Sequence, residues 1–264
     1  MQSKPHIAVV GAGIVGICSA YFLKKSGFNV TLIDKNDPGS MTSYGHACTF
    51  ADYASVPVNS PDLFREIPSM LFRSDGPLSV DFFHVLKNLR WSFKFLQNCT
   101  TKNVNHISNS LGNLLNSAST SYDEIFSDVD VSEYIKNEEA IYLYQNADEY
   151  LKAKTTNELR EKSGVKIKHL SKNEVLELEP NLAPVFYNGQ LFIGSRHTTN
   201  PLMISKKIFD TFTSSGGVFI KDKVNKIVPQ DDFININYNG VDNKFDKIII
   251  CAGSWSNDLS KKIW

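Results

Sequence analysis

The 264-residue chain is poor in the features that mark several classes of protein. Its four cysteines, Cys18, Cys48, Cys99 and Cys251, form no C-x-x-C pair, so a reduced, cytoplasmic protein without a metal site is expected. Basic and acidic residues both number 28 and no basic tract stands out, which argues against a nucleic-acid partner. No apolar run has the length of a membrane span. The first predicted strand begins so close to Met1 that a cleaved signal peptide is not expected.

The N-terminal stretch HIAVVGAGIVGICSAYFLKKSGFNVTLID has the pattern of a strand, a helix and a second strand. Ile7–Val10 is a short apolar run rich in β-branched residues, which is typical of a strand buried on both faces. A helix is predicted over Ile14–Ser26 and is ended by Gly27. A second strand is predicted over Asn29–Ile33 and is closed by Asp34.

The turn between the first strand and the helix carries Gly11, Gly13 and Gly16 in a G-x-G-x-x-G motif. The first glycine permits the tight turn, the second lets the backbone approach a pyrophosphate, and the third lets the helix pack on the strand. The helix N-terminus directs N–H groups at the phosphates. Asp34 follows at the distance of about 20 residues at which an acid binds ribose hydroxyls, so NADP is not expected. The stretch predicts a site for the ADP half of NAD or FAD.

The segment after Asp34 does not continue as a nicotinamide-binding domain would, with another helix and a third parallel strand. Residues 35–64 show no helical period and are rich in Gly, Ser and Pro. We expect a long ordered loop, and such a loop in a compact domain is usually functional.

Helices are predicted next, over residues 62–72, 79–97 and 106–128. In the second of them, apolar residues recur at helical spacing and basic residues lie on the flank: Phe82, Leu86, Leu89, Phe93 and Leu96, with Lys87, Arg90 and Lys94. An aromatic stripe at this spacing favours a packed core helix. The alternative is a basic amphipathic helix in peripheral contact with the inner face of a membrane.

From about Glu139 the pattern alternates between short strands and helices, which favours a smaller α+β unit. Ser171 and Glu174 have the spacing of a capping box, and Asn200 is placed to cap a later helix. The predicted strands cover residues 140–145, 165–170, 189–194, 218–228, 233–238 and 244–253, and the predicted helices cover 147–164, 171–180 and 200–217.

The last of these strands resembles the first, because Lys247–Cys251 is again β-branched and apolar and ends in Ala252 and Gly253. We expect it to return to the nucleotide-binding sheet after a long excursion. The predicted fold is α/β, a discontinuous Rossmann-like FAD-binding domain with an inserted helical segment and an α+β substrate (cap) unit. An inserted unit that covers an isoalloxazine favours a flavin over a nicotinamide. The predicted segments are 1–60 and 196–264 for the FAD-binding domain, 61–138 for the helices and 139–195 for the cap.

Four stretches make the chain resemble the D-amino-acid-oxidase-type FAD-dependent oxidoreductases, and more closely their bacterial D-amino-acid dehydrogenase branch. They are the fingerprint VVGAGIVGICSAYFL with VTLIDK, the loop TSYGHACTFADYASVPVNSPDLFREIPSMLF followed by GPLSV, the segment EVLELEPNLA, and the strand IIICAGSWS. The resemblance covers nearly the whole chain. The second stretch is the specific one, since the first and last occur in many flavoproteins.

The chain departs from that branch in two places. It has Gly45-His46-Ala47-Cys48 where the branch usually has Gly-Asn-Ala-Gly. His46 is interpreted as a hydrogen-bonding substitute, and covalent attachment of FAD through it is the alternative. Family members also continue well past the AGSWS motif, whereas this chain stops at Trp264. We therefore expect the N-terminal part of a longer enzyme, with little activity by itself.

The resemblance implies an FAD-dependent oxidation of an amine C–N bond, most readily of a D-amino acid, by hydride transfer to flavin N5. The electron acceptor would be oxygen or the quinone of a respiratory chain. Alternatives are an oxidase or dehydrogenase of glycine, sarcosine or proline analogues, a nicotinamide-dependent dehydrogenase, and a non-catalytic FAD-binding fragment. Family members hold the substrate carboxylate with an arginine, and no arginine of this chain lies on a matching motif. No catalytic residue is predicted.

The resemblance also implies the residues that contact FAD. Gly11, Gly13 and their neighbours would wrap the pyrophosphate, Asp34 would bind the ribose, and the loop at Ser43 would run toward the flavin ring. The full predicted set is Val10, Gly11, Ala12, Gly13, Ile14, Val15, Gly16, Asp34, Lys35, Ser43, Tyr44, Gly45, His46, Ala47, Val224, Ala252 and Gly253.

Overall fold

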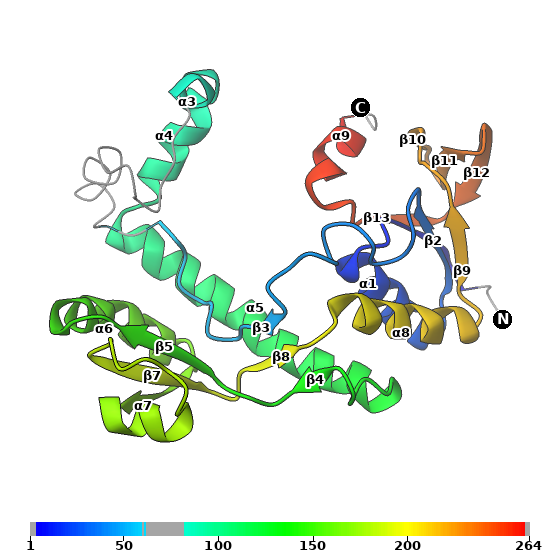
Figure 1. Cartoon of the computed structure of the whole chain (residues 1–264). Helices are drawn as coiled ribbons and strands as arrows, with labels where there is room; N and C mark the ends of the chain where they lie inside the picture. Colours follow the sequence, from blue (N-terminus) through cyan, green and yellow to red (C-terminus); the bar gives the residue numbers. More distant parts are fainter. Residues whose placement is uncertain (1–3, 60, 62–81, 262–264) are drawn as a thin grey trace. The chain divides into compact units, whose positions relative to one another are not determined.

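The computed structural model describes residues 4–59, 61 and 82–261 (Figure 1). The chain forms two compact units, and each unit is built from segments that are distant in the sequence. The first unit consists of Met1–Thr49, Asp123–Lys136 and His197–Trp264, and the second of Phe50–Tyr122 and Asn137–Arg196. The division of the chain into residues 1–60, 61–138, 139–195 and 196–264 stays a prediction.

The first unit contains a four-stranded parallel sheet in the order β13-β1-β2-β9. The strands are β1 (His6–Val10), β2 (Asn29–Asp34), β9 (Val218–Lys221) and β13 (Lys247–Ile250). The side chains of β1 and β2 are almost entirely buried, as expected for central parallel strands. This sheet confirms the predicted Rossmann-like α/β fold and the return of the last apolar strand to the sheet.

Helices α1 (Ile14–Lys25) and α8 (Pro201–Ser214) pack against each other in the first unit. As predicted, Asn200 caps α8, because its side chain accepts a hydrogen bond from the N–H of Met203 at 3.1 Å. Phe212 of α8 is fully buried. These helices supply the apolar cover that a parallel sheet requires.

An antiparallel meander of β10 (Lys226–Pro229), β11 (Ile234–Tyr238) and β12 (Val241–Phe245) follows β9. It buries a core with the parallel sheet, which includes Ala8, Val10, Ile33, Ile227 and Phe245. The turn between β11 and β12 is Asn-Gly with positive φ at both residues, the chemistry of a tight hairpin.

The single strand predicted over 218–228 is wrong, because β9 and β10 belong to different sheets. The chain turns between them at Asp222, whose carboxylate accepts hydrogen bonds from the N–H of Lys223 and from that of Asn239 in the hairpin turn. Cys251, predicted to be inside the last strand, lies just after β13. The strand predicted over 244–253 covers the end of β12, which pairs with β11, and the whole of β13, which pairs with β1.

Shorter elements complete the first unit. β4 (Ile135–Lys136) pairs with β8 (Arg196–Thr198), whose first residue is the last of the second unit, through Ile135 opposite Thr198 and Lys136 opposite His197. A 3-10 turn, η1 (Gly253–Trp255), and the short helix α9 (Ser256–Ser260) follow β13. The loop predicted for residues 35–64 is irregular where it is described, except for the two-residue strand β3 (Thr49–Phe50).

The end of α5 (Thr101–Asp128) is tied to α1 in the first unit by charged groups. The ammonium of Lys25 contacts the carboxylates of Asp128 at 2.7 Å and Glu124 at 2.9 Å. The hydroxyl of Tyr21 also donates to Asp128. The bond from Lys25 is the main cause that lowers the pKa of Asp128, so this carboxylate is ionised at neutral pH.

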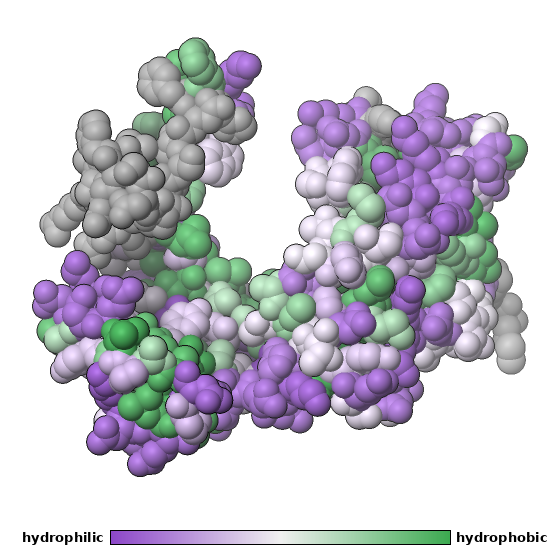
Figure 2. Space-filling model, viewed as in Figure 1, coloured by the Kyte–Doolittle hydropathy of each residue, from purple (hydrophilic) through white to green (hydrophobic). Residues whose placement is uncertain are grey.

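The second unit contains an antiparallel sheet in the order β5-β7-β6, formed by β5 (Ala140–Tyr144), β6 (Lys166–Leu170) and β7 (Asn188–Ile193). Successive residues of β7 lie on opposite faces. Leu191 joins a cluster with α7 (Lys172–Leu178), while Gln190 bonds to Asn157 of α6 (Ala147–Lys162). In Figure 2 hydrophobic side chains gather over β5, β7 and α7.

Helix α7 begins with the predicted capping box. The side chain of Ser171 accepts from the N–H of Glu174, and the carboxylate of Glu174 accepts from the N–H of Ser171. The predicted strands at 140–145, 165–170 and 189–194 correspond to β5, β6 and β7, and the helix predicted at 147–164 corresponds to α6. Local patterns therefore specified these elements.

The helix predicted over 79–97 is two helices, α3 (Phe82–Lys87) and α4 (Leu89–Gln97), separated at Asn88. Asn88 has φ −119° and ψ 32°, which interrupts the helical backbone. The interpretation of this segment as a core helix is wrong, because α4 buries none of its residues. The helix predicted over 106–128 is α5, which begins earlier, at Thr101. The helix predicted over 62–72 lies outside the described residues.

Candidate functional site

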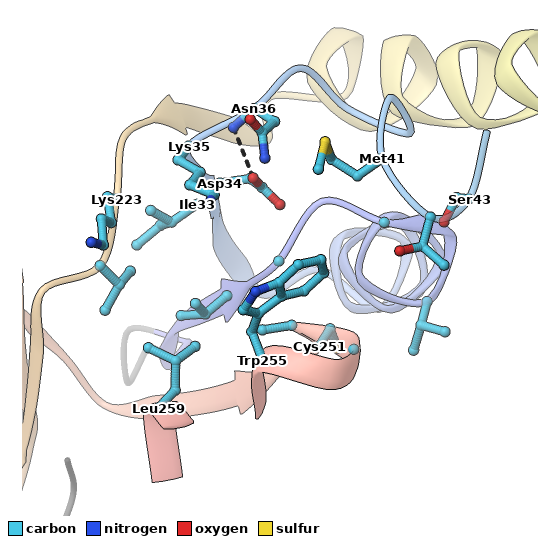
Figure 3. A pocket seen from close by; sticks show the side chains of 18 of the residues that line it. Ile33, Asp34, Lys35, Asn36, Met41, Ser43, Lys223, Cys251, Trp255 and Leu259 are labelled. Atoms are coloured by element: carbon cyan, nitrogen blue, oxygen red, sulfur yellow. Dashed lines mark hydrogen bonds between the residues drawn. The ribbon is translucent and has the colours of Figure 1, made fainter. Parts of the chain in front are cut away.

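A cavity of about 710 Å³ lies in the first unit at the carboxyl ends of β1 and β2 (Figure 3). In open α/β sheets ligands bind beyond the carboxyl ends of the strands. Five segments contribute to its wall: the turn after β1, the start of α1, the loop after β2, the turn after β9 and the segment after β13. Segments distant in sequence therefore converge at one site.

Two of the three motif glycines are required by the fold itself. Gly11 has φ +110°, and a Cβ there would lie 2.5 Å from the carbonyl oxygen of Cys251. A Cβ at Gly16 would overlap the carbonyl oxygen of Gly11. These glycines let the turn, α1 and the segment after β13 pack together.

Gly13 has a different role, because it lines the cavity and its backbone is not crowded. A Cβ there would meet only the hydroxyl oxygen of Ser43, at 3.2 Å, among its close neighbours. A side chain at Gly13 is therefore compatible with the fold but fills space beside the helix N-terminus. This is the cradle that a pyrophosphate needs.

The N-terminus of α1 offers N–H groups to an anion. Gly13 is the N-cap residue and has no side chain to satisfy the first turn, which contains no acidic residue. The N–H of Ile14 donates to the hydroxyl of Ser43 at 2.9 Å. Unsatisfied N–H groups and the helix dipole favour a phosphate at this position.

Asp34 lies at the end of β2 and its carboxylate is fixed by two backbone groups. One oxygen accepts from the N–H of Ala12 at 2.7 Å. The other accepts from the N–H of Asn36 at 2.8 Å, the bond drawn in Figure 3. A carboxylate has about four lone-pair sites, so acceptor capacity remains on the cavity side. The arrangement fits an acid that binds ribose hydroxyls.

The opposite wall is more apolar. Figure 3 shows Trp255 and Leu259 projecting from the segment after β13 toward the cavity, with Cys251 beside them. Burial is the main cause that raises the pKa of the Cys251 thiol, so this sulfur is a neutral part of the wall. An apolar wall opposite a phosphate cradle suits a ligand that combines rings with phosphates.

Most of the residues predicted to contact FAD line this cavity: Val10, Gly11, Gly13, Ile14, Val15, Asp34, Lys35, Ser43, His46, Val224, Ala252 and Gly253. The others are not part of its wall: Ala12, Gly16, Tyr44, Gly45 and Ala47. Ala12 and Gly16 are buried and shape the turn, whereas the loop residues are exposed. Contact of any of them with FAD stays a prediction.

His46 has a defined hydrogen bond. Its Nδ1 accepts from the N–H of Cys48 at 2.9 Å, and Cys48 has φ +63°. Because a backbone N–H can only donate, Nδ1 is unprotonated and the neutral ring carries its proton on Nε2. His46 therefore presents a donor rather than an acceptor at its free nitrogen.

Sequence reasoning missed part of the wall: Ile33, Asn36, Met41, Thr42, Asp222, Lys223, Cys251, Trp255, Asp258 and Leu259. Trp255 belongs to the AGSWS motif, and Met41 and Thr42 adjoin the predicted loop at Ser43. These neighbouring motifs could have predicted that the three residues line the cavity. The turn at Asp222 and the helix at Leu259 carry no motif. Only the pairing of β13 with β1 brings the latter to the cavity.

Among the residues that the structure describes, no arginine lines this cavity. Arg90 lies on the exposed side of α4, while Arg160 and Arg196 belong to the second unit and lie over aromatic rings there. Arg65 and Arg73 lie outside the described residues.

In the described ranges no cluster of three His, Cys, Asp or Glu side chains could hold a metal ion. The helices described here also include none with the length and apolar character of a membrane span.

Comparisons with known proteins agree with this geometry. Residues 6–263 match the family model DAO, described as FAD dependent oxidoreductase. The chain is 25% identical to a D-amino-acid oxidase of Bradyrhizobium diazoefficiens over 271 residues, which cover 100% of this chain and 63% of that protein. The chain thus spans less than two thirds of the length of this relative.

Solved structures share the fold. Glycine oxidase from Geobacillus kaustophilus is similar with a TM-score of 0.66 and 16% identity, over 99% of this chain and 58% of that one. L-alpha-glycerophosphate oxidase from Mycoplasma pneumoniae, with FAD bound, has a TM-score of 0.64 and 17% identity, over 99% and 57%.

The residues of the cavity fit FAD. Gly13 leaves room for a pyrophosphate at the N-terminus of α1, Asp34 keeps free acceptor capacity, and Trp255 offers a ring on the opposite wall. The family match extends over nearly the whole chain, from β1 to the segment after α9. From its fold, its glycine turn and this match, the chain belongs to the DAO family of FAD-dependent oxidoreductases, and FAD is its cofactor.

Proposed function

We propose that this chain belongs to an enzyme that oxidises the C–N bond of an amine, with a D-amino acid as the preferred substrate class. The cavity at the ends of β1 and β2 carries the proposal, because it combines a phosphate cradle, a ribose acceptor and an apolar wall. The likeness to a D-amino-acid oxidase supports the substrate class. The similarity to the bacterial D-amino-acid dehydrogenase branch rests on the loop around Ser43 and His46.

The proposed contacts follow from the wall of the cavity. Gly13 and the first turn of α1 hold the pyrophosphate, Asp34 binds the adenosine ribose, and Lys35 and Val224 flank the adenine. Ser43 and His46 extend along the ribityl chain toward the flavin ring. The hydroxyl of Ser43 accepts from Ile14 N–H, and its own O–H can donate to a phosphate oxygen at the same time.

When bound, FAD would supply the acceptor for the hydride that leaves the carbon carrying the amine. The chain's residues position and shield this cofactor: the apolar wall at Trp255 and Leu259 excludes water, and the turn at Gly11 fixes the pyrophosphate end. Glycine, sarcosine and proline analogues are the alternative substrates. Oxygen and a membrane quinone are the alternative electron acceptors, and a cytoplasmic location is proposed from the reduced cysteines.

We assign no catalytic residue to this chain, since its described cavity contains no arginine that could hold a substrate carboxylate. The 264-residue polypeptide, purified with added FAD, should therefore show little turnover with an artificial dye as acceptor. D-amino acids, glycine, sarcosine and proline analogues form the assay panel. Robust turnover of any of them would contradict this part of the proposal.

The FAD site is tested with Gly13→Val. The added side chain fills the cradle, so FAD affinity should fall by about 100-fold, measured by flavin fluorescence titration. The urea midpoint of the variant should stay close to that of the wild type, because only Ser43 is close to the new Cβ. Gly13→Ala adds a smaller group and should lose less affinity. Unchanged FAD affinity in Gly13→Val, or tight NADH binding with no flavin bound, would overturn the site.

His46 is tested by its effect on bound flavin. His46→Asn replaces an Nε2–H donor by an amide, so it should shift the flavin absorption or the reduction potential of the loaded protein. An unchanged spectrum and potential would place His46 away from the ring. Flavin that stays with the protein after acid precipitation would instead favour the covalent attachment considered above.

A further inference from the structure

Large apolar side chains are concentrated on α3 and α4 and face solvent. Five of them have exposed fractions between 47% and 75%: Phe83, Leu86, Leu89, Trp91 and Phe93. All five fall between positions 83 and 93, whereas α5, of 28 residues, has a single exposed large apolar side chain, Leu114. Monomeric proteins seldom expose such a cluster without a partner for it.

The apolar and basic residues of α4 lie on different sides of the helix. Leu89 and Phe93 are one turn apart, and Arg90 and Lys94 are one turn apart on an adjacent side. Trp91 extends the apolar arc and stacks on Phe95 with ring centroids 5.4 Å apart. The helix is therefore amphipathic, with aromatic residues on its apolar side and only cations among its charged residues.

The charge around these helices differs from that of the whole chain. Residues 82–122 contain Lys87, Arg90, Lys94 and Lys102 but no aspartate or glutamate, although the chain as a whole has no net charge. Lys87, Arg90 and Lys94 are exposed. None of these three side chains forms an ion pair within the part of the chain that the structure describes. As far as the described residues go, the three charges are therefore available to an external anionic surface.

We propose that α3 and α4 bind the surface of a membrane that contains anionic lipids. Trp, Phe and Leu insert at the boundary of headgroups and acyl chains, while Lys and Arg contact the lipid phosphates. The uniform sign of the charges favours lipid over a second copy of this chain, because two copies would bring four or more cations together without an acid between them. This contact is independent of FAD binding.

The first test measures co-sedimentation of the full chain with lipid vesicles. Binding should be strong with phosphatidylcholine vesicles that contain phosphatidylglycerol, weak with phosphatidylcholine alone, and reduced at 1 M salt, where screening acts over about 3 Å. Each basic residue near an anionic surface strengthens binding about five-fold. Lys87→Glu, Arg90→Glu and Lys94→Glu together should weaken it by at least about 100-fold.

A matched control reverses three exposed lysines of the same unit, Lys152, Lys154 and Lys168, and should bind almost as well as the wild type. Brominated lipid should quench part of the tryptophan fluorescence of the wild type, and Trp91→Phe should lose that quenching while still binding. Equal binding to neutral and anionic vesicles, or equal loss in both triple variants, would overturn the proposal. A third result would also overturn the proposal: the wild type binds no vesicles but forms an oligomer, and the double variant Trp91→Ser with Phe93→Ser dissociates that oligomer. This result would indicate a protein partner.

Discussion

The parallel sheet of the first unit and the antiparallel sheet of the second use strands of similar length but bury them differently. In β1 and β2 nearly every side chain is buried, and Val9 and Leu32 have no exposed surface. In β5, by contrast, Tyr142 and Leu143 are each 39% exposed although they point to opposite faces. The first sheet is held by apolar cover on both faces, and the second depends more on a few specific side-chain contacts.

The specific contacts of the second unit include polar ones. Gln190 of β7 and Asn157 of α6 are both buried and exchange two hydrogen bonds, at 2.6 and 3.1 Å. Arg160 lies over the rings of Tyr142 and Phe192 and donates to Asn157 at 2.9 Å. Buried polar groups that satisfy one another fix one arrangement of a core, while an apolar core depends on volume and shape.

The largest effect is expected from crowding the backbone of the first unit. Gly16→Val would place a side chain on the carbonyl oxygen of Gly11, which cannot move without opening the turn. We expect a loss of about 5 kcal/mol in the free energy of unfolding, measured by urea denaturation. Gly45→Val is the control for stability, because no atom lies within 4 Å of the new Cβ. Equal urea midpoints for the two variants would contradict the role given to Gly16.

A cavity in the second unit should cost slightly less. Phe192 is 1% exposed, stacks on Tyr53 with centroids 4.2 Å apart and meets Tyr142 edge-on at 4.8 Å. Phe192→Ala should lower the free energy of unfolding by about 4 kcal/mol. Ile193→Ala changes the next residue of the strand, which is partly exposed, and should cost less than about 1.5 kcal/mol. Hydrogen exchange should locate the loss in β5, β6 and β7.

In the polar core of the second unit, the loss of stability should increase with the number of hydrogen bonds that a substitution removes. Asn157→Leu removes the hydrogen bonds that Asn157 forms with both Gln190 and Arg160, while Gln190→Leu removes only those between Gln190 and Asn157. We expect losses of about 3 and about 1.5 kcal/mol in the free energy of unfolding. Urea midpoints of the two variants check the order. The reverse order would show that packing, not hydrogen bonding, dominates here.

The smallest effect is expected from the exposed ion pairs of the first unit. The Lys25 ammonium is the main cause that holds the pKa of Asp128 below its usual value of 3.8. A lowered folded-state pKa gives stability that is present above pH 3.8 and is lost as pH falls through the folded value. The melting temperatures of the wild type and Asp128→Asn should therefore differ at pH 7 and converge in acid. A difference that does not change with pH would contradict the ionic origin.

Local sequence patterns were sufficient to predict the elements that are specified by residues close together in the chain. Three such features are present in the structure: the glycine motif of the first turn, the Ser171 capping box and the Asn200 cap. Each acts within a few residues. The apolar, β-branched character of β1 and β13 likewise indicated central strands of one parallel sheet. These features could be predicted because their physical cause lies in the local sequence.

Other outcomes depended on contacts between distant residues. The break at Asn88 and the exposure of Trp91 could not be predicted, since an amphipathic pattern is the same whether its apolar side meets a core, a membrane or solvent. The turn at Asp222 is fixed by Asn239, and no local signal marks that bond. The apolar arrangement of α4 was visible in the sequence, but its surroundings were not.

The sequence by itself determined the glycine turn, the acid at the end of β2 and the two apolar strands that pair in parallel. The spacing of apolar residues, the turn of the chain and the freedom of the backbone at glycine are all properties of short segments. Only the tertiary structure decided which residues form the wall of the cavity. Trp255 and Leu259 reach it because β13 lies beside β1, so residues more than two hundred positions from Gly11 end at the same edge of the sheet. The hydrogen bonds of a parallel sheet, rather than any motif, bring the two halves of this cavity together.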